Sequence, residues 1–215
     1  IGRRGCCGGL IGHNEKAAAI LAAVKAGAPN LPVSVKTRLG LREIITEDWT
    51  GFLLGQDLAA LTIHGRTVKE MSKVPAHWDE IAKVVKLRDQ IAPHTLIIGN
   101  GDIQSRAHGL KLAEETGVDG LMIGRGIFHD PFVFATEETA HELAQMLAIL
   151  LRHLDLYEQW GSKKSFQTLK KFFKIYVKAW PGAHELRAEL MEATTPAEVR
   201  AIIAAYAPPT AIELH

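Results

Sequence analysis

The sequence has few cysteines and almost no net charge, and each shortage excludes a class of protein. Cys6 and Cys7 are its only cysteines, and sequence neighbours rarely form a disulfide without strain. A disulfide-stabilised secreted domain is therefore excluded, and the expected location is the reducing cytoplasm. The formal net charge is +1, so any surface that attracts nucleic acid or a membrane must be local. No apolar run approaches the roughly 18 residues that span a bilayer.

The residues that are present indicate a globular α/β protein. Hydrophobic residues make up 47% and charged residues 23% of the chain, as in ordinary globular domains. Four apolar runs, beginning at Pro32, Leu58, Thr95 and Val118, have the near-continuous character of strands buried on both faces. Their spacing of roughly 25–35 residues matches the repeat of a (β/α)8 barrel. Four units would form half of such a barrel, although a small doubly wound sheet has a similar period. Helical patterns at 14–27, 76–92 and 104–117 separate the runs.

A second part of the chain carries helical patterns only. These patterns cover residues 137–161, 163–180, 183–193 and 197–207, and Pro181 and Pro196 interrupt them. The sequence therefore predicts an α/β domain over residues 1–135, followed by an all-α domain over residues 136–215.

Polar residues follow each predicted strand, where a buried strand has no packing reason to carry them. A single polar residue there would more often be a loop hydrogen bond, but four successive groups indicate a binding site. The carboxyl ends of parallel strands converge on one mouth, where barrels place their sites. The residues concerned are Lys36, Arg38, His64, Arg66, Thr67, Asn100, Gly101, Asp102, Gly124 and Arg125.

The residue types at these strand ends suit an anion. Glycines in "GNGD" and "IGRG" let backbone N–H groups approach a phosphate, and Arg125 adds a guanidinium fork. The loops after the last two strands of a barrel are its usual phosphate-binding position. Lys36 lies in mid-strand, where a buried cation needs an anionic or electron-rich neighbour.

The segments "PVSVKTRLG", "LTIHGRT", "IIGNGDI" and "DGLMIGRGIFHDPFVF" together closely resemble the tRNA-dihydrouridine synthases, and the resemblance runs along nearly the whole chain. It implies a flavin enzyme on a TIM barrel with a helical tRNA-binding domain. In that family NADPH reduces FMN, hydride passes to C6 of a flipped-out uracil, and a cysteine protonates C5. The expected cofactors are FMN and NADPH, and the expected partner is tRNA.

The resemblance also implies a role for each matching residue. Lys36 would lie against the pyrimidine side of the flavin, and His64 would contact the flavin. Arg38, Arg66 and Thr67 would lie at the mouth near tRNA or the flavin phosphate, with ion pairs at the barrel rim as the alternative for both arginines. No metal is expected, because the histidines lack metal-ligand spacing. The ribityl-phosphate arm would be held by Asn100, Gly101, Asp102, Gly124 and Arg125.

The family's acid cysteine belongs to an Asn-Met-Gly-Cys-Pro motif at the end of the fourth strand. Cys6 and Cys7 align with small residues after that motif, and Gly8 follows where the motif has proline. We therefore expect both cysteines in a tight turn, and no catalytic residue in this chain. The family cysteine and strands one to four would precede Ile1. The chain is interpreted as a C-terminal portion, with the N-terminal half of the barrel as a candidate partner.

Lysines recur every four residues in the predicted helix over 163–180. Lys170, Lys174 and Lys178 would share one face, either as a solvated surface or as contacts to tRNA phosphates. Two alternatives to the synthase remain. One is a non-catalytic RNA-binding remnant, and the other is an FMN-dependent barrel oxidoreductase that acts on a small molecule.

Overall fold

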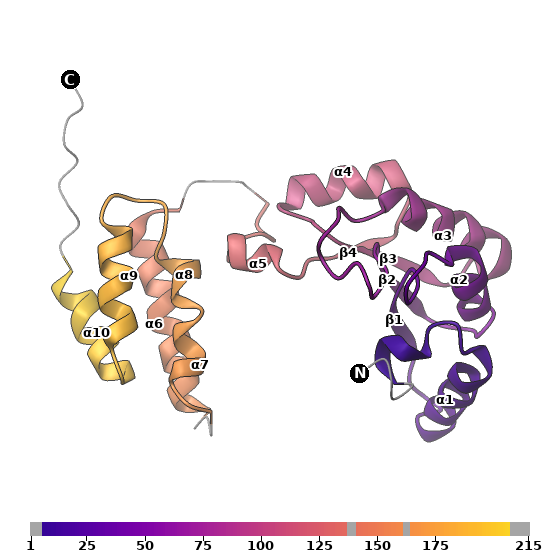
Figure 1. The fold of residues 1–215 in the computed structure, drawn as a ribbon, viewed down its shortest axis with the longest axis horizontal. Helices are drawn as coiled ribbons and strands as arrows, with labels where there is room; N and C mark the ends of the chain where they lie inside the picture. Colours follow the sequence, from indigo (N-terminus) through magenta and orange to yellow (C-terminus); the bar gives the residue numbers. More distant parts are fainter. Residues whose placement is uncertain (1–5, 137–140, 161–163, 207–215) are drawn as a thin grey trace. The chain divides into compact units, whose positions relative to one another are not determined.

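A computed structural model of the chain describes residues 6–136, 141–160 and 164–206 (Figure 1). It divides into two compact units, Ile1–Ile127 and Phe128–His215. The predicted boundary between residues 135 and 136 lies inside the second unit. Each unit has its own hydrophobic core.

The first unit is built on a four-stranded parallel sheet with strand order β1-β2-β3-β4. Each strand lies within one of the four predicted apolar runs, so the prediction of four parallel strands is confirmed. The strands are β1 Ser34–Arg38, β2 Ala60–His64, β3 Leu96–Asn100 and β4 Gly120–Met122.

Four longer helices accompany these strands, and three of them confirm the predicted helices. The predictions missed α2, although Glu47 and Asp48 in its first turn favour a helix start. The turn-like elements η2 and α5 were also not predicted. The bounds are η2 Cys7–Leu10, α1 Asn14–Gly27, α2 Thr46–Leu54, α3 Trp78–Ile91, α4 Arg106–Thr116 and α5 Gly126–His129.

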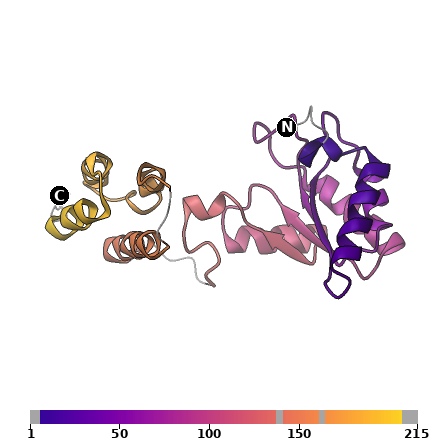
Figure 2. The same cartoon turned by 90° about the horizontal axis from the view of Figure 1, so that it is seen from below.

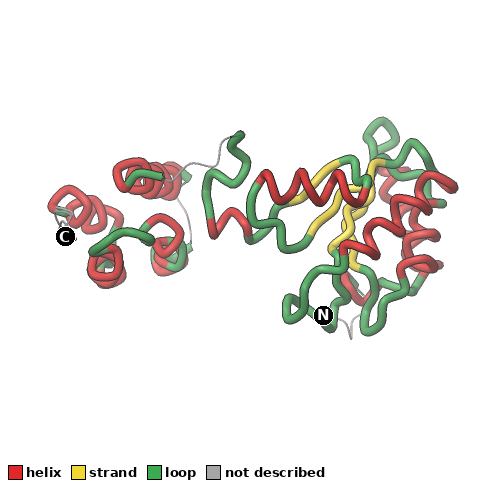
Figure 3. Tube along the Cα trace, turned by 90° about the horizontal axis from the view of Figure 1, so that it is seen from above, coloured by secondary structure: helices red, strands yellow, loops and turns green. Residues whose placement is uncertain are grey.

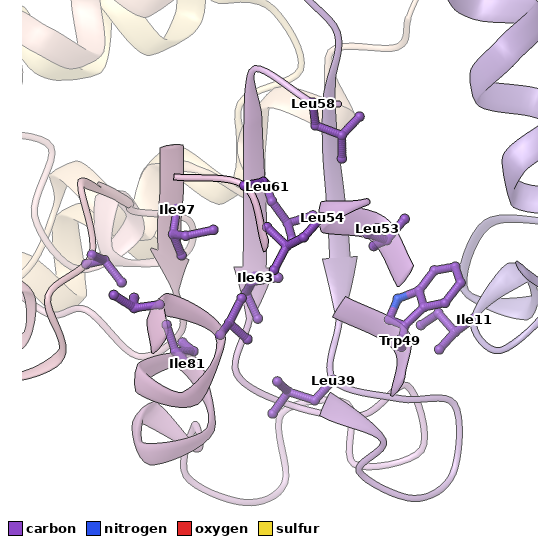
Figure 4. Close-up of a cluster of buried hydrophobic side chains, with 14 of the residues drawn as sticks. Ile11, Leu39, Trp49, Leu53, Leu54, Leu58, Leu61, Ile63, Ile81 and Ile97 are labelled. Carbon is purple, nitrogen blue, oxygen red and sulfur yellow. The ribbon is translucent and has the colours of Figure 1, made fainter. Parts of the chain in front are cut away.

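The two faces of the sheet differ. Helices run beside the strands (Figure 3). Leu61, Ile63 and Ile97 are fully buried in the core that these elements share (Figure 4). The alternate positions belong to the opposite face, where Lys36 and Leu96 are exposed. The prediction that every strand is buried on both faces is therefore wrong for β1 and β3. The physical reason is that the apolar core formed with α1 to α4 takes up side chains from only one face of the sheet.

In the described residues of the second unit the regular structure is helical, as predicted, and Figure 2 views these helices nearly along their axes. Leu150, Leu154 and Phe173 are fully buried in its core. The predicted helix over 137–161 begins at Leu143; residues 137–140 and 161 lie outside the described residues. None of the helices in the described ranges is long and apolar enough to cross a membrane. The bounds are α6 Leu143–Gln159, α7 Gln167–Lys170, α8 Phe173–Tyr176, α9 Ala183–Glu192 and α10 Pro196–Ala205.

The prediction of one helix over 163–180 is wrong, because the segment is broken between α7 and α8. The N–H of Phe172 bonds to the carbonyl of Leu169 at 2.9 Å, and the N–H of Ile175 bonds to the carbonyl of Phe172 at 2.8 Å. These bonds span three residues rather than four, so the chain tightens at this point. The regular lysine spacing of one continuous α-helix therefore does not apply across this break.

Candidate functional site

Adjacent strands bring the predicted residues to one face and one end of the sheet. In the parallel register Arg38 pairs with His64, and His64 pairs with Asn100. Lys36 lies two residues before Arg38 and therefore shares its face. The convergence expected from the sequence is confirmed for these four residues.

The turn after β3 is held rigidly. Asn100 donates its side-chain amide N–H to the carbonyl of Met122 at 2.6 Å, and Trp78 donates its indole N–H to the carbonyl of Gly101 at 3.1 Å. Gly101 has φ of +138°, and a Cβ there would lie 2.6 Å from the Cβ of Ala76. Glycine is required at this position both by the backbone conformation and by the lack of space.

Arg66 is enclosed by the protein itself. Its side chain is 3% exposed, its Nε donates to the carbonyl of Val74 at 2.6 Å, and a terminal NH2 group is paired with Asp102. Burial raises the pKa of Asp102, but the bonds from Arg66 and from the N–H of Ala76 outweigh this and lower it. The rim ion pair, rather than a phosphate contact, is the arrangement found for Arg66. Asp102 holds this arginine in place, and the predicted contact of Asp102 with the ribityl-phosphate arm stays a prediction.

Thr67 is also enclosed, with 1% of its surface exposed. Its N–H donates to a carboxylate oxygen of Glu70 at 2.7 Å, and its hydroxyl accepts from the N–H of Glu70 at 3.2 Å. This reciprocal pairing fixes a turn. These bonds give Thr67 a structural role, and its direct contact with tRNA stays a prediction.

The two basic residues of β1 remain partly accessible. Arg38 donates to the carbonyls of Thr67 and Met71 at 2.8 and 3.1 Å. Lys36 is exposed on the same face, not buried as expected, although partial burial and the charge of Arg38 lower its pKa. Both side chains line an apolar pocket of about 570 Å³ that also reaches Cys7 and Trp49.

Cys6 and Cys7 are exposed and form no disulfide. The chain turns there, with the N–H of Gly9 bonded to the carbonyl of Cys6 at 3.0 Å, and Cys7 opens the short helix η2. The predicted tight turn is confirmed.

The turn after β4 is exposed at Gly124 and Arg125. No atom lies within 4 Å of a Cβ built on Gly124. The side chain of Arg125 is 62% exposed, and its guanidinium lies 3.7 Å from an Asp102 carboxylate oxygen. An uncovered glycine backbone beside an exposed guanidinium offers donors that suit a phosphate.

The second unit has a basic pocket of about 370 Å³. Lys170, predicted to face tRNA, is only 5% exposed and its ammonium donates to the carbonyl of Ala193 at 2.8 Å, so its predicted exposed position is wrong. Lys178 donates to the carbonyl of His129. The sequence analysis missed His184 and Arg187, which lie on a different helix from the lysines. The pocket is lined by Lys170, Lys171, Lys174, His184, Arg187, Ala188 and Met191.

These features define an α/β protein with an anion-suited edge on a parallel sheet and a separate helical unit with a basic pocket. A protein-family model described as dihydrouridine synthase matches residues 2–210. The chain is 49% identical over 206 residues to the probable tRNA-dihydrouridine synthase of Staphylococcus aureus, covering 94% of this chain and 62% of that protein. It is 48% identical over 198 residues to the probable tRNA-dihydrouridine synthase 2 of Bacillus subtilis, covering 91% of this chain and 60% of that protein. The chain belongs to the dihydrouridine synthase family and spans about six tenths of these relatives.

Proposed function

We propose that the protein of which this chain forms part is an FMN-dependent tRNA-dihydrouridine synthase, with NADPH as reductant. The family match over residues 2–210 carries this proposal. The relatives have more residues than the matched part, and we propose that these complete the parallel sheet as a (β/α)8 barrel. In that arrangement, the first unit holds the flavin and the second unit holds tRNA. The acid that protonates the uracil comes from outside this chain.

The flavin phosphate would lie at the turn after β4. Gly124 offers a backbone N–H with open space beside it, and Arg125 offers an exposed guanidinium. Lys36, His64 and Asn100 supply donors on the adjacent sheet face for the ring and its arm, and Gly101 fixes the turn that carries Asn100. When bound, FMN would pass hydride between NADPH and the uracil ring. These residues bind and orient it.

Replacing Arg125 with alanine is expected to weaken FMN binding at least tenfold, because one charge-assisted phosphate contact contributes about 1.5–3 kcal/mol. The measurement is the visible absorbance of FMN during titration with the purified chain. Lys86→Ala removes an exposed cation from α3 and should leave the titration unchanged. A flavin shift that Arg125→Ala shares with the unaltered chain would contradict the phosphate site. If the unaltered chain gives no shift, flavin binding cannot be assigned to this chain alone.

The tRNA backbone would meet the basic pocket of the second unit. Lys174 is exposed there, and Lys171 lies 4.9 Å from the centre of the Phe172 ring. Arg187 donates to the carbonyl of Val177 at 3.1 Å, which fixes its guanidinium beside them. Its positive residues come from α7, α8, α9 and the turn between α7 and α8. Such a local patch suits a polyanion even though the net charge is close to zero.

Replacing Lys171 and Lys174 together with glutamine is expected to reduce the slope of log binding constant against log salt by about two, because each lost phosphate contact removes about one. The affinity for tRNA is measured by fluorescence anisotropy from low to high salt. Lys170→Met is the matched control: its ammonium is internal, so stability should fall while the salt slope stays constant. Equal slopes in all three proteins would contradict tRNA binding at this pocket.

A further inference from the structure

His64 and Arg66 lie side by side at the carboxyl end of β2. The Nε2 atom of His64 is 3.2 Å from a terminal NH1 nitrogen of Arg66. The guanidinium cannot turn away, because its Nε is bonded to the carbonyl of Val74 and its NH2 group to Asp102. Asp102 is fixed in turn by the N–H of Ala76 at 2.9 Å. The geometry of the pair is thus set by three separate segments of the chain.

The hydrogen bond between these two side chains determines which ring nitrogen of His64 carries the proton. A guanidinium only donates, so the facing ring nitrogen must accept and carries no proton. The one proton of the neutral ring then lies on Nδ1. A protonated imidazolium would place an N–H against the N–H of Arg66, with both groups positive.

Burial and the surrounding charges also favour the neutral form of the His64 ring. Burial first, and then Arg38, Lys36 and Arg66, lower the pKa of His64 to about 4, and only Asp102 opposes them. The carboxylate of Asp102 is already paired with Arg66 and lies near Arg125.

We propose that Arg66 is a positioning residue that holds His64 as the neutral tautomer protonated at Nδ1. His64 then presents a hydrogen-bond donor on this face of the sheet, which suits an uncharged acceptor. A neutral ring supplies neither a cation for phosphate nor an acid for the uracil ring. The acceptor class that fits is a carbonyl oxygen of a heteroaromatic ring, which flavin and uracil share. The assignment of the tautomer does not depend on the proposed function, whereas the identity of the acceptor rests on that function.

The tautomer is tested in the chain as it exists, by two-dimensional ¹⁵N NMR of the histidine rings, with His64→Gln to assign the signal. We expect Nε2 of His64 to show the shift of an unprotonated ring nitrogen and Nδ1 that of a protonated one, unchanged between about pH 7 and pH 5.5 because its pKa is about 4. Arg66→Lys has a single side-chain nitrogen and cannot occupy the three positions of Nε, NH1 and NH2, so it should shift the signal toward the other tautomer. A protonated Nε2 in the unaltered chain would overturn the proposal even if Arg66→Lys fails to fold.

The donor role is tested by binding. Asparagine places an amide near the position of Nδ1, and glutamine places one near Nε2. We expect His64→Asn to retain ligand affinity and His64→Gln to lose at least tenfold. Loss of FMN affinity assigns the acceptor to the flavin, and loss of tRNA affinity alone assigns it to uracil. If both variants bind both ligands like the unaltered chain, His64 is not the donor, whereas absence of flavin binding in every protein contradicts only flavin binding by this chain.

Discussion

Gly101→Ala is expected to destabilise the first unit by about 2–6 kcal/mol, since a strained backbone conformation and overpacking each cost about 1–3 kcal/mol. The φ of +138° disfavours any side chain, and the new methyl group would lie 2.6 Å from the Cβ of Ala76. The collision would displace the turn whose carbonyl accepts the indole N–H of Trp78. The loss is measured as faster hydrogen exchange of β2 and β3 under native conditions, which reports on this unit separately.

Gly124→Ala is the matched control at the end of the neighbouring strand. Its added Cβ meets no atom within 4 Å, and no positive φ opposes it. Exchange in β2 and β3 should therefore remain as in the unaltered chain, while the methyl group covers the backbone N–H that we assign to the phosphate. The pair separates the roles of two glycines, because Gly101 is required for folding and Gly124 for access. Equal destabilisation by both substitutions would contradict this distinction.

The sequence was sufficient to predict the strands and the convergence of their ends, because both depend on local periodicity and on the parallel order. It was not sufficient to distinguish residues that bind a ligand from residues whose hydrogen bonds and ion pairs stay within the protein. Arg66 appears in "HGRT" as one more basic residue at a strand end. Its burial depends on Asp102, 36 residues later, and on the carbonyl of Val74.

In the helical unit, too, the sequence did not show which basic residues are enclosed by the protein. The spacing of Lys170 and Lys174 predicts one exposed face, but the break after α7 and the carbonyl of Ala193, 23 residues later, bring Lys170 inside. The basic pocket combines α8 with α9, and no spacing within one segment indicates that pairing. Helix α2 was missed for a different reason: it has only nine residues, so it gives a weak periodic signal.

Arg88→Met is expected to destabilise the first unit by about 1.5–3 kcal/mol, the usual contribution of hydrogen bonds made by a charged group, because Arg88 is enclosed while its partner Asp119 keeps 32% of its side chain exposed. Arg88 is 7% exposed on α3 and donates to Asp119 at 2.6 Å and to the carbonyl of Thr95 at 2.9 Å. The same Asp119 oxygen accepts the N–H of Ile97 at 2.7 Å. One guanidinium thus connects α3 to the segments around β3 and β4. Urea unfolding followed by hydrogen exchange in β3 measures the loss.

Lys86→Met on the same helix is the control, since Lys86 is exposed and substitutions of exposed residues usually change stability little. It should leave β3 exchange unchanged, and a loss as large as that of Arg88→Met would show that any cation removed from α3 has this effect.

The dependence of stability on pH is a more specific test of the ion pair between Arg88 and Asp119. Burial raises the pKa of Asp119, but the N–H of Ile97 and the Arg88 guanidinium outweigh it and lower the pKa below its usual value. A carboxyl with a lowered native pKa stabilises the fold above its unfolded pKa of about 3.9, and this contribution is lost as the pH falls through the native value. Arg88→Met removes in advance the part of that contribution that comes from the guanidinium. The stability difference between the two proteins should therefore be constant from pH 7 to pH 5 and shrink below about pH 4. A difference that stays constant down to pH 2 would assign the loss to the packing of the arginine stem rather than to its charge.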